Sequence, residues 1–313
     1  MRRRRGRPVD GWINLDKPAG ISSAQAVARA RRALDAAKAG HAGTLDPFAT
    51  GVLPIAFGEA TKTMRFLADA TKSYRFTVRW GAARTTDDCE GEVVEESARR
   101  PSREEILAVL PRFLGPIRQT PPAYSAIRVD GQRAYALARA GVSVALAERT
   151  VVIRALELLE QPDADRAAFA ASCGKGAYMR ALARDLARAL GTLGHLEALR
   201  RTAVGRFAEA DAISLERLAE LGHSAAASPP LLPIPAALDD IPALALPRDE
   251  ALCLMRGQAV AVLRSDVRQC VAAVGEEGVV LITTASRPVA LARVEGMTLK
   301  PLRVFNLTEG ETI

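Results

Sequence analysis

The sequence predicts a mixed α/β (α+β) fold with a small β-rich domain at its C-terminal end. Residues 74–80 alternate between apolar and polar side chains, which is the period of a strand with one buried face. Residues 181–190 instead repeat leucines at helical spacing. The elements do not follow the regular rhythm that would require a parallel sheet, so we expect helices and strands to be mixed within one large domain.

Serine and glycine positions mark where the helices begin and end. Ser22–Ser23 precedes an apolar pattern and predicts the start of a helix. Ser102 and Glu105 have the spacing of a capping box, so a second helix is expected to follow them. A third helix is expected over Ala181–Leu190, and it should stop at Gly191 because glycine readily adopts the left-handed conformation of a helix C-terminus.

Composition divides the chain of 313 residues into four parts. Residues 1–8 form an arginine-rich basic tail, and residues 9–223 form the large domain. Residues 224–247 are rich in proline, which neither a helix nor a central strand tolerates, so we predict a connector that packs on the large domain. Residues 248–313 hold short apolar runs between glycine and proline signals, which is typical of a small β domain.

Charge and cysteine content narrow the class of protein. The net charge is +7, from 43 Lys and Arg against 36 Asp and Glu, and the tail predicts attraction to polyanions such as nucleic acid. Apolar runs are too short for a membrane helix, and no apolar segment follows the tail as it would in a secretory signal. Scattered cysteines without a Cys-x-x-Cys pair favour a cytoplasmic protein without a metal site or disulfides. No nucleotide-binding motif occurs, so no cofactor is expected.

Residues 40–54 form the densest candidate site. Three glycines and two prolines surround Asp46, which predicts a loop, and loops on a rigid scaffold carry reactive groups. The proline after Asp46 favours an extended backbone that holds the carboxylate away from helical neighbours. A structural interpretation stays open on spacing alone, because in an Asx-Pro turn Asp46 would only bond its own backbone.

Residues 173–180 combine glycines and a lysine with the start of a helix. Lys175 lies between two glycines, where backbone N–H groups at a helix start can bind phosphate. Arg180, Arg184 and Arg188 are spaced four residues apart and share one helical face. That face is either a phosphate-binding surface or a solvated basic face, and periodicity does not decide between them.

Residues 118–154 contain six arginines and two acids, with tyrosines interleaved. Arginine with aromatic residues is typical of proteins that bind looped RNA, although tyrosines that only support the fold would look the same. Asp87–Asp88 suggests a glycosidase or a metal site. Adjacent side chains diverge in regular structure and Gly91 follows, so a turn is the preferred interpretation.

Together these segments resemble the bacterial TruB family of tRNA pseudouridine synthases across most of residues 9–223. The resemblance rests on ordered motifs at residues 14–23 (NLDKPAGISS), 40–54 (GHAGTLDPFATGVLP), 72–74 (KSY), 120–131 (TPPAYSAIRVDG), 174–180 (GKGAYMR) and 199–202 (LRRT). It implies a catalytic domain with a mixed β-sheet flanked by helices, and an RNA-gripping insertion at about 118–154. Residues 256–258 and 299–306 resemble parts of the PUA-like RNA-binding domain that follows it in the family.

The resemblance implies an isomerase that converts the T-loop uridine of tRNA (position 55) into pseudouridine without a cofactor. Asp46 is implied as the nucleophile, because a carboxylate with an unperturbed pKa of about 3.9 is ionised at neutral pH. Arg180 is implied as its ion-pair partner, and Tyr74 as the ring that stacks on the flipped uracil and a candidate for removing the C5 proton. The implied substrate-binding residues are His41, which replaces the departed base, Tyr178 and Leu199, which line the uracil pocket, and Lys17, Lys175 and Arg184.

Two other functions stay open at this point. The basic segments would also suit a tRNA-binding folding chaperone whose effect is independent of catalysis. A metal-dependent hydrolase that uses His41, Asp46 and Asp87 is a more distant alternative. The resemblance itself implies the T stem-loop of tRNA as the partner of a monomer that needs no protein partner and no metal.

Overall fold

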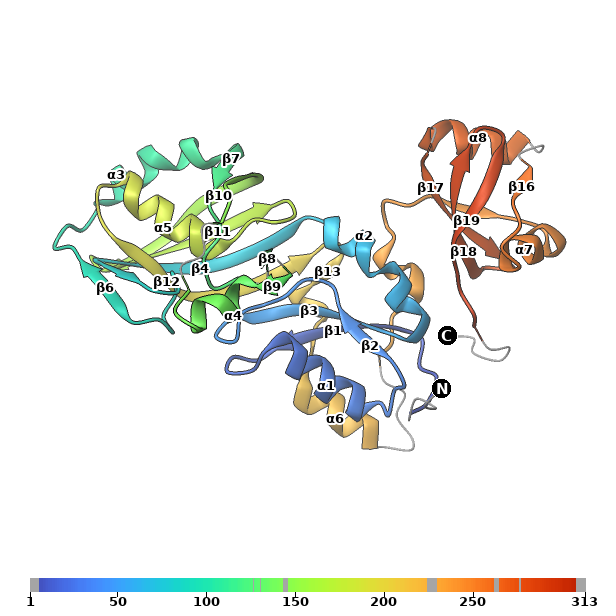
Figure 1. The fold of residues 1–313 in the computed structure, drawn as a ribbon, viewed down its shortest axis with the longest axis horizontal. Helices are drawn as coiled ribbons and strands as arrows, with labels where there is room; N and C mark the ends of the chain where they lie inside the picture. The colour runs from blue at the N-terminus through green and yellow to red at the C-terminus, as the bar shows by residue number, and fades with distance from the viewer. Residues whose placement is uncertain are drawn as a thin grey trace.

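The computed structural model describes residues 6–125, 127–129, 131–142, 146–223, 230–261, 265–275 and 277–307. Most of the predicted basic tail therefore lies outside the described residues. The chain forms a large N-terminal domain built on one extended sheet and a smaller C-terminal domain (Figure 1). The predicted mixed α/β class is confirmed. Among the described residues, no helix is long and apolar enough to cross a membrane.

The large sheet contains ten strands among the described residues and mixes parallel with antiparallel pairs. Eight strands follow one path, and β2 (Ala39–His41) and β13 (Phe207–Ala208) pair beside it with β3 and β12. The order along the path is β14 (Ile213–Ser214), β1 (Gly11–Lys17), β3 (Thr50–Phe57), β12 (Gly194–Val204), β4 (Lys72–Trp80), β11 (Arg166–Cys173), β10 (Arg149–Asp163) and β7 (Gly115–Gln119).

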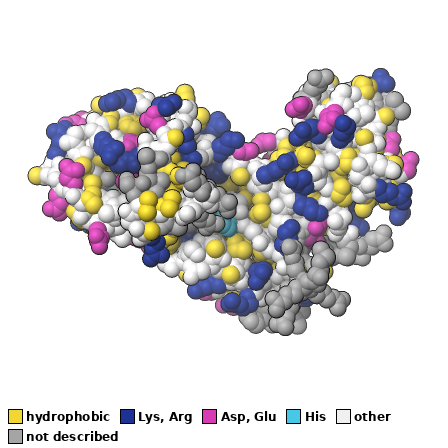
Figure 2. All heavy atoms as spheres, viewed as in Figure 1, with side chains coloured by type: hydrophobic (Ala, Val, Ile, Leu, Met, Phe, Trp, Pro, Cys, Tyr) yellow, Lys and Arg dark blue, Asp and Glu magenta, His cyan; other side chains and the backbone are white. Residues whose placement is uncertain are grey.

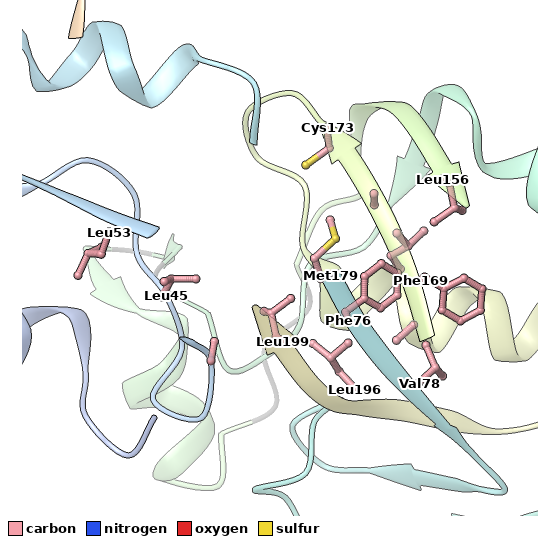
Figure 3. Close-up of a cluster of buried hydrophobic side chains, with 14 of the residues drawn as sticks. Leu45, Leu53, Phe76, Val78, Leu156, Phe169, Cys173, Met179, Leu196 and Leu199 are labelled. Atoms are coloured by element: carbon pink, nitrogen blue, oxygen red, sulfur yellow. The ribbon is translucent and has the colours of Figure 1, made fainter. Parts of the chain in front are cut away.

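The alternating segment at residues 74–80 is confirmed as a strand, β4. Its buried face carries Phe76, Val78 and Trp80, while Arg75 and Arg79 on the other face are exposed. Phe76 stacks on Phe169 of β11 with ring centroids 5.3 Å apart, so the face that alternation predicted is the one that packs into the core (Figure 3).

The predicted helices are present with the expected caps. Ser22 caps α1 (Ser23–Ala33) and Ser102 caps α3 (Arg103–Val109), each in a reciprocal capping box. The third predicted helix, α5 (Met179–Ala189), begins two residues earlier than expected and is followed by Gly191 with a φ of 69°. In Figure 1, α1 and α6 (Leu215–His223) lie below β1–β3, whereas α3 and α5 lie above the half built on β4 and β12.

A close approach of backbones joins the two halves of the large sheet. β3 pairs in parallel with β12 through Thr50–Arg200 and Gly51–Arg201. Gly51 has a φ of +102°, and a Cβ added there would lie 2.2 Å from the Arg201 carbonyl oxygen. Only glycine fits this position. The loop at residues 42–49, which lies between β2 and β3, is thereby placed at the junction of the two halves.

The C-terminal domain is a sheet with helices α7 (Arg248–Met255) and α8 (Ser265–Val274). Its first strand, β15 (Ala243–Ala245), lies within the predicted connector and pairs in parallel with β17. The C-terminal sheet thus begins before residue 248, because the four residues between Pro242 and Pro247 are enough to hold a three-residue edge strand. The full order is β15, β17 (Val279–Thr284), β18 (Arg287–Glu295), β19 (Thr298–Val304) and β16 (Val260–Ala261).

One hydrophobic cluster is shared between the two domains. Trp12 from β1 and Ile234 from the connector pack in the same cluster as three buried C-terminal residues, Leu281, Leu291 and Phe305. Polar contacts support it: Lys62 Nζ donates to the Val304 carbonyl oxygen at 2.7 Å, and the Asn306 amide donates to Glu59 at 2.6 Å. Figure 2 shows Lys and Arg side chains gathered where α2 (Met64–Asp69) meets the C-terminal domain.

Candidate active site

An aspartate and an arginine from distant parts of the chain form the centre of the site. Asp46 lies in the loop at residues 42–49, and Arg180 lies in the first turn of α5. Arg180 Nη2 donates to Asp46 Oδ1 at 3.1 Å, and Nε lies 3.0 Å from Oδ2. The arginine side chain is 4% exposed and the aspartate side chain 31% exposed. The guanidinium therefore holds the carboxylate at two points and leaves part of it open to solvent.

Other groups fix the Arg180 guanidinium from its remaining sides. It donates to the carbonyl oxygens of Thr86 at 3.0 Å and Tyr124 at 2.8 Å. Its Nη1 also lies 3.4 Å from Oδ2 of the buried Asp88. Loss of this arginine would leave both carboxylates without their cation.

The segment at Asp87–Asp88 is a turn, as predicted, and its two carboxylates also form ion pairs with arginines of α5. Asp87 has a φ of 60°, and its carboxylate accepts from Arg184 at 2.8 Å. Asp88 faces Arg180. Because the two carboxylates lie against arginines, neither is placed to bind a cation. Among the described residues, no group of three or more His, Cys, Asp or Glu side chains could hold a metal ion.

Opposing effects act on the Asp46 carboxyl group. Burial raises the pKa of Asp46, Arg180 lowers it, and the nearby Asp88 raises it again. The unperturbed pKa assumed from the sequence is therefore incorrect for the folded protein. Arg180 is the strongest influence that favours the ionised form needed for nucleophilic attack.

Two buried side chains hold the backbone of the loop that carries Asp46. Ser23 Oγ donates to the Leu45 carbonyl oxygen at 2.9 Å and accepts from the Leu45 amide at 2.8 Å. Arg201, which is 1% exposed, donates to the carbonyl oxygens of Val52 at 2.7 Å and Gly43 at 3.2 Å. Ser23 and Arg201 belong to segments that the sequence singled out, yet these contacts were not predicted.

Lys17 is not placed to meet a substrate. Its side chain is buried, and Nζ donates to the carbonyl oxygens of Pro18 and Ile21 at 2.8 Å and of Pro47 at 3.2 Å. Burial lowers the pKa of Lys17 to about 8. All three N–H donors of the ammonium are used, so the prediction of substrate binding does not fit this geometry. The lysine instead ties the loop after β1 to the residue that follows Asp46.

Tyr74 and Leu199 lie on adjacent strands close to the Asp46 loop. Tyr74 pairs with Arg201 across β4 and β12, and Leu199 pairs with Phe76. Figure 3 shows Leu199 beside Phe76, with Leu45 of the loop across from it, and the three side chains belong to one cluster. Burial raises the pKa of Tyr74, and Arg201 opposes this shift.

His41 and Tyr178 come from the ends of elements that border the site. His41 ends β2 and is half-buried, and burial lowers the pKa of its ring, which favours the neutral form. Tyr178 is the N-cap residue of α5, directly before Met179 and Arg180. Its backbone is held by Gln119, which donates to the Tyr178 carbonyl oxygen at 3.2 Å and accepts from its amide at 2.8 Å.

On the basic face of α5, Arg180 and Arg184 are largely buried in ion pairs, and only Arg188, at 67% exposed, is solvated. Arg184 is 13% exposed and is bound by Asp87, by Asp185 at 2.9 Å and by the Thr120 carbonyl oxygen at 2.8 Å. The prediction that Arg184 binds substrate therefore does not fit its placement. Lys175 is exposed and forms a surface ion pair with Asp69 at 2.9 Å, which leaves it accessible to an incoming phosphate.

Comparison with known sequences places this geometry in a family. Residues 31–179 match the N-terminal domain of TruB family pseudouridylate synthases, and residues 180–241 match the C-terminal domain of tRNA pseudouridylate synthase B. The tRNA pseudouridine synthase B of Bradyrhizobium diazoefficiens is 55% identical over 311 residues, covering 98% of this chain and 88% of that protein. The chain belongs to the TruB family. Its enzymes are isomerases, and the one from Caulobacter vibrioides is 52% identical over 308 residues, 98% of this chain and 99% of its own length.

Solved structures share the TruB fold. A chain in the crystal structure of a Cbf5-Nop10-Gar1 complex has a TM-score of 0.73 at 26% identity, covering 94% of this chain and 84% of that one. A chain in an H/ACA RNP bound to a substrate RNA containing 2'-deoxyuridine also has a TM-score of 0.73, at 23% identity, with coverage of 99% and 92%. The second likeness concerns the fold alone.

Proposed function

We propose that this TruB family member converts the T-loop uridine of tRNA, at position 55, into pseudouridine, with Asp46 as the nucleophile and the target base flipped out of the loop. The observation that carries the proposal is the two-point contact between Asp46 and Arg180. The similar proteins of Bradyrhizobium and Caulobacter are named tRNA pseudouridine synthase B, which supports tRNA as the substrate. The enzyme acts on the T stem-loop as a cytoplasmic monomer without a protein partner.

The reaction breaks the N1–C1′ bond of uridine and forms a C5–C1′ bond, so substrate and product are isomers. Asp46 either attacks C1′ or assists the loss of uracil as a glycal is formed. The base then turns and C5 bonds to C1′, as the Asp46–C1′ bond breaks in the first route or as a proton returns to C2′ of the glycal in the second. The proton on C5 is then removed while one is gained at N1. One proton is exchanged with solvent but the net composition and oxidation state do not change, so the reaction needs neither an oxidant nor an energy donor.

The surrounding side chains would support these steps. Tyr74 stacks on the flipped uracil and is the candidate for removing the C5 proton; burial raises the pKa of its phenol, and the neighbouring Arg201 opposes this shift. Leu199 and Tyr178 line the uracil pocket, and the neutral ring of His41 fills the space that the base leaves. Base flipping costs only a few kcal/mol in a structured loop, which such contacts can offset. Lys175 contacts phosphate and contributes affinity without sequence choice.

Tritium release from C5-labelled uridine in a T-stem-loop RNA tests the proposal, without added cofactor and in the presence of EDTA. Asp46→Asn should abolish release while leaving tRNA binding largely intact, because the amide is not a nucleophile. Asp35→Asn is the matched control, since this aspartate is 72% exposed and far from Arg180 in the sequence. Full activity of Asp46→Asn would refute the assignment of the nucleophile.

Two further outcomes bear on the alternatives. If the protein acts as a folding chaperone, the Asp46→Asn variant should keep the full biological effect when it is expressed in a strain that lacks the wild-type protein. A metal-dependent hydrolase predicts loss of activity with EDTA. The first result would show that the biological effect does not depend on catalysis, and the second would count against the proposed cofactor-free isomerase mechanism.

A further inference from the structure

The predicted RNA-gripping insertion is attached to the large sheet by two residues that face each other. β7 ends at Gln119, β10 begins at Arg149, and these two residues pair directly across the antiparallel ladder. The chain between them leaves the sheet and returns at this pair. Both side chains contact the same residue, Tyr178, at the start of α5.

Gln119 holds the backbone of Tyr178. It is 1% exposed, and its side-chain amide binds both the N–H and the C=O of Tyr178. Tyr178 is the N-cap residue of α5 but supplies no side-chain cap. The two hydrogen bonds from Gln119 therefore set the backbone direction at the point where the helix of Arg180 begins.

Arg149 holds the ring of Tyr178. Its guanidinium carbon lies 4.9 Å from the ring centroid, within the range of a cation–π contact. Nη2 also donates to the Gly176 carbonyl oxygen. Gly176 has a φ of +83°, and a Cβ there would lie 3.6 Å from the guanidinium carbon. Arg149 thus packs between the glycine loop and one face of the tyrosine ring.

We propose that Gln119 and Arg149 are positioning residues that fix Tyr178 for catalysis, one through its backbone and the other through its ring. Gln119 and Arg149 are also the residues at which the insertion joins the sheet. The same pair therefore holds both the insertion and Tyr178 in the wall of the uracil pocket. The inference rests on the proposed function, which places Tyr178 in that pocket. The competing role for Arg149 is direct contact with an RNA phosphate.

Three arginine variants separate these roles. We expect Arg149→Met and Arg149→Lys to lower kcat for tritium release by about 10- to 100-fold, the size expected for a misplaced pocket group. Lysine should not rescue, because it lacks the planar group that stacks on a ring. Binding of the T-stem-loop RNA, and its dependence on salt, should stay at wild-type values. Arg112→Met removes the same charge from an exposed position before β7 and should change neither property.

A phosphate contact would produce the opposite pattern. Arg149→Met would then weaken RNA binding, reduce the slope of log K against log salt by about 0.9 and leave kcat unchanged, while Arg149→Lys would restore binding. That pattern would overturn the inference for Arg149.

A double-mutant cycle tests whether Arg149 acts through the Tyr178 ring. Arg149→Met and Tyr178→Leu should each lower kcat, and the double variant should be no worse than Tyr178→Leu alone, because Tyr178→Leu already removes the ring that Arg149 contacts. Gln119→Met should lower kcat further in the Tyr178→Leu background, because its hydrogen bonds go to the backbone that this variant keeps. Additive losses in Arg149→Met and Tyr178→Leu would overturn the proposed role of Arg149, and an unchanged kcat in Gln119→Met would overturn that of Gln119. Thermal unfolding of each variant identifies losses that come from misfolding. If the wild type released no tritium, the proposed function itself would fail. If the wild type is active and Asp46→Asn is inactive, the proposed function stands, and a contrary result with the Gln119 or Arg149 variants refutes the positioning inference alone.

Discussion

Replacing Ser23 by alanine should destabilise the protein and misplace Asp46 at the same time. Ser23 is 2% exposed, and its hydroxyl makes two hydrogen bonds, at 2.9 Å to the Leu45 carbonyl oxygen and at 2.8 Å from the Leu45 amide. Alanine leaves both backbone groups buried without a partner. Each such group costs about 1–3 kcal/mol, so the free energy of unfolding should fall by about 2–6 kcal/mol. Because Leu45 directly precedes Asp46, kcat should fall as well.

Ser22→Ala is a control from the neighbouring position. Ser22 accepts from the Gln25 amide at 3.2 Å at the exposed start of α1 and does not contact the loop. Loss of this cap should cost about 1 kcal/mol and leave kcat unchanged. Urea denaturation measures the stability of both variants, and tritium release measures kcat. Equal losses of stability in the two variants, with kcat intact in Ser23→Ala, would refute the reasoning.

Three more expectations follow from the site. Arg180 lowers the pKa of Asp46, so in Arg180→Lys, which loses the two-point contact, that pKa should rise and the acidic limb of the kcat/KM profile should move to higher pH. Arg184→Met leaves the partly buried carboxylate of Asp87 unpaired and should lower the free energy of unfolding, measured by urea denaturation, by about 3–5 kcal/mol. The control Arg188→Met changes a side chain that is 67% exposed and should lower it by less than about 0.5 kcal/mol. Burial raises the pKa of the Cys173 thiol to about 11, so a thiol reagent at neutral pH should modify it only in denaturant, as mass spectrometry of the digested protein would reveal.

Local signals in the sequence predicted the elements well. Alternation located β4, and the serine and glutamate of a capping box located α3. These features depend on residues within one or two turns of each other, so a single segment contains the whole pattern. The contact between Asp46 and Arg180 joins residues 134 positions apart, and it was expected only because both motifs resemble a family.

Roles that depend on distant partners were not predictable from spacing. The period of four put Arg184 on one face of α5, but the turn that pairs with it lies 97 residues earlier. The carbonyl oxygens that accept from Lys17 belong to Pro18 and Ile21, in the loop that follows β1, and to Pro47, directly after Asp46. Ser22 and Ser23 have the same local signal, yet one caps a helix and the other holds the loop.

The hydrophobic cluster shared by Trp12, Ile234 and Phe305 has a consequence for how the molecule gains its stability. A fragment that ends after the connector would retain every described strand of the large sheet but would lose Leu281, Leu291 and Phe305 from this cluster. Because this cluster draws residues from both domains, we expect the pair to melt in a single cooperative transition. The large domain and the C-terminal domain, which differ in composition, should therefore fold as one unit. The C-terminal domain then helps to keep the enzyme folded, although it does not contain Asp46.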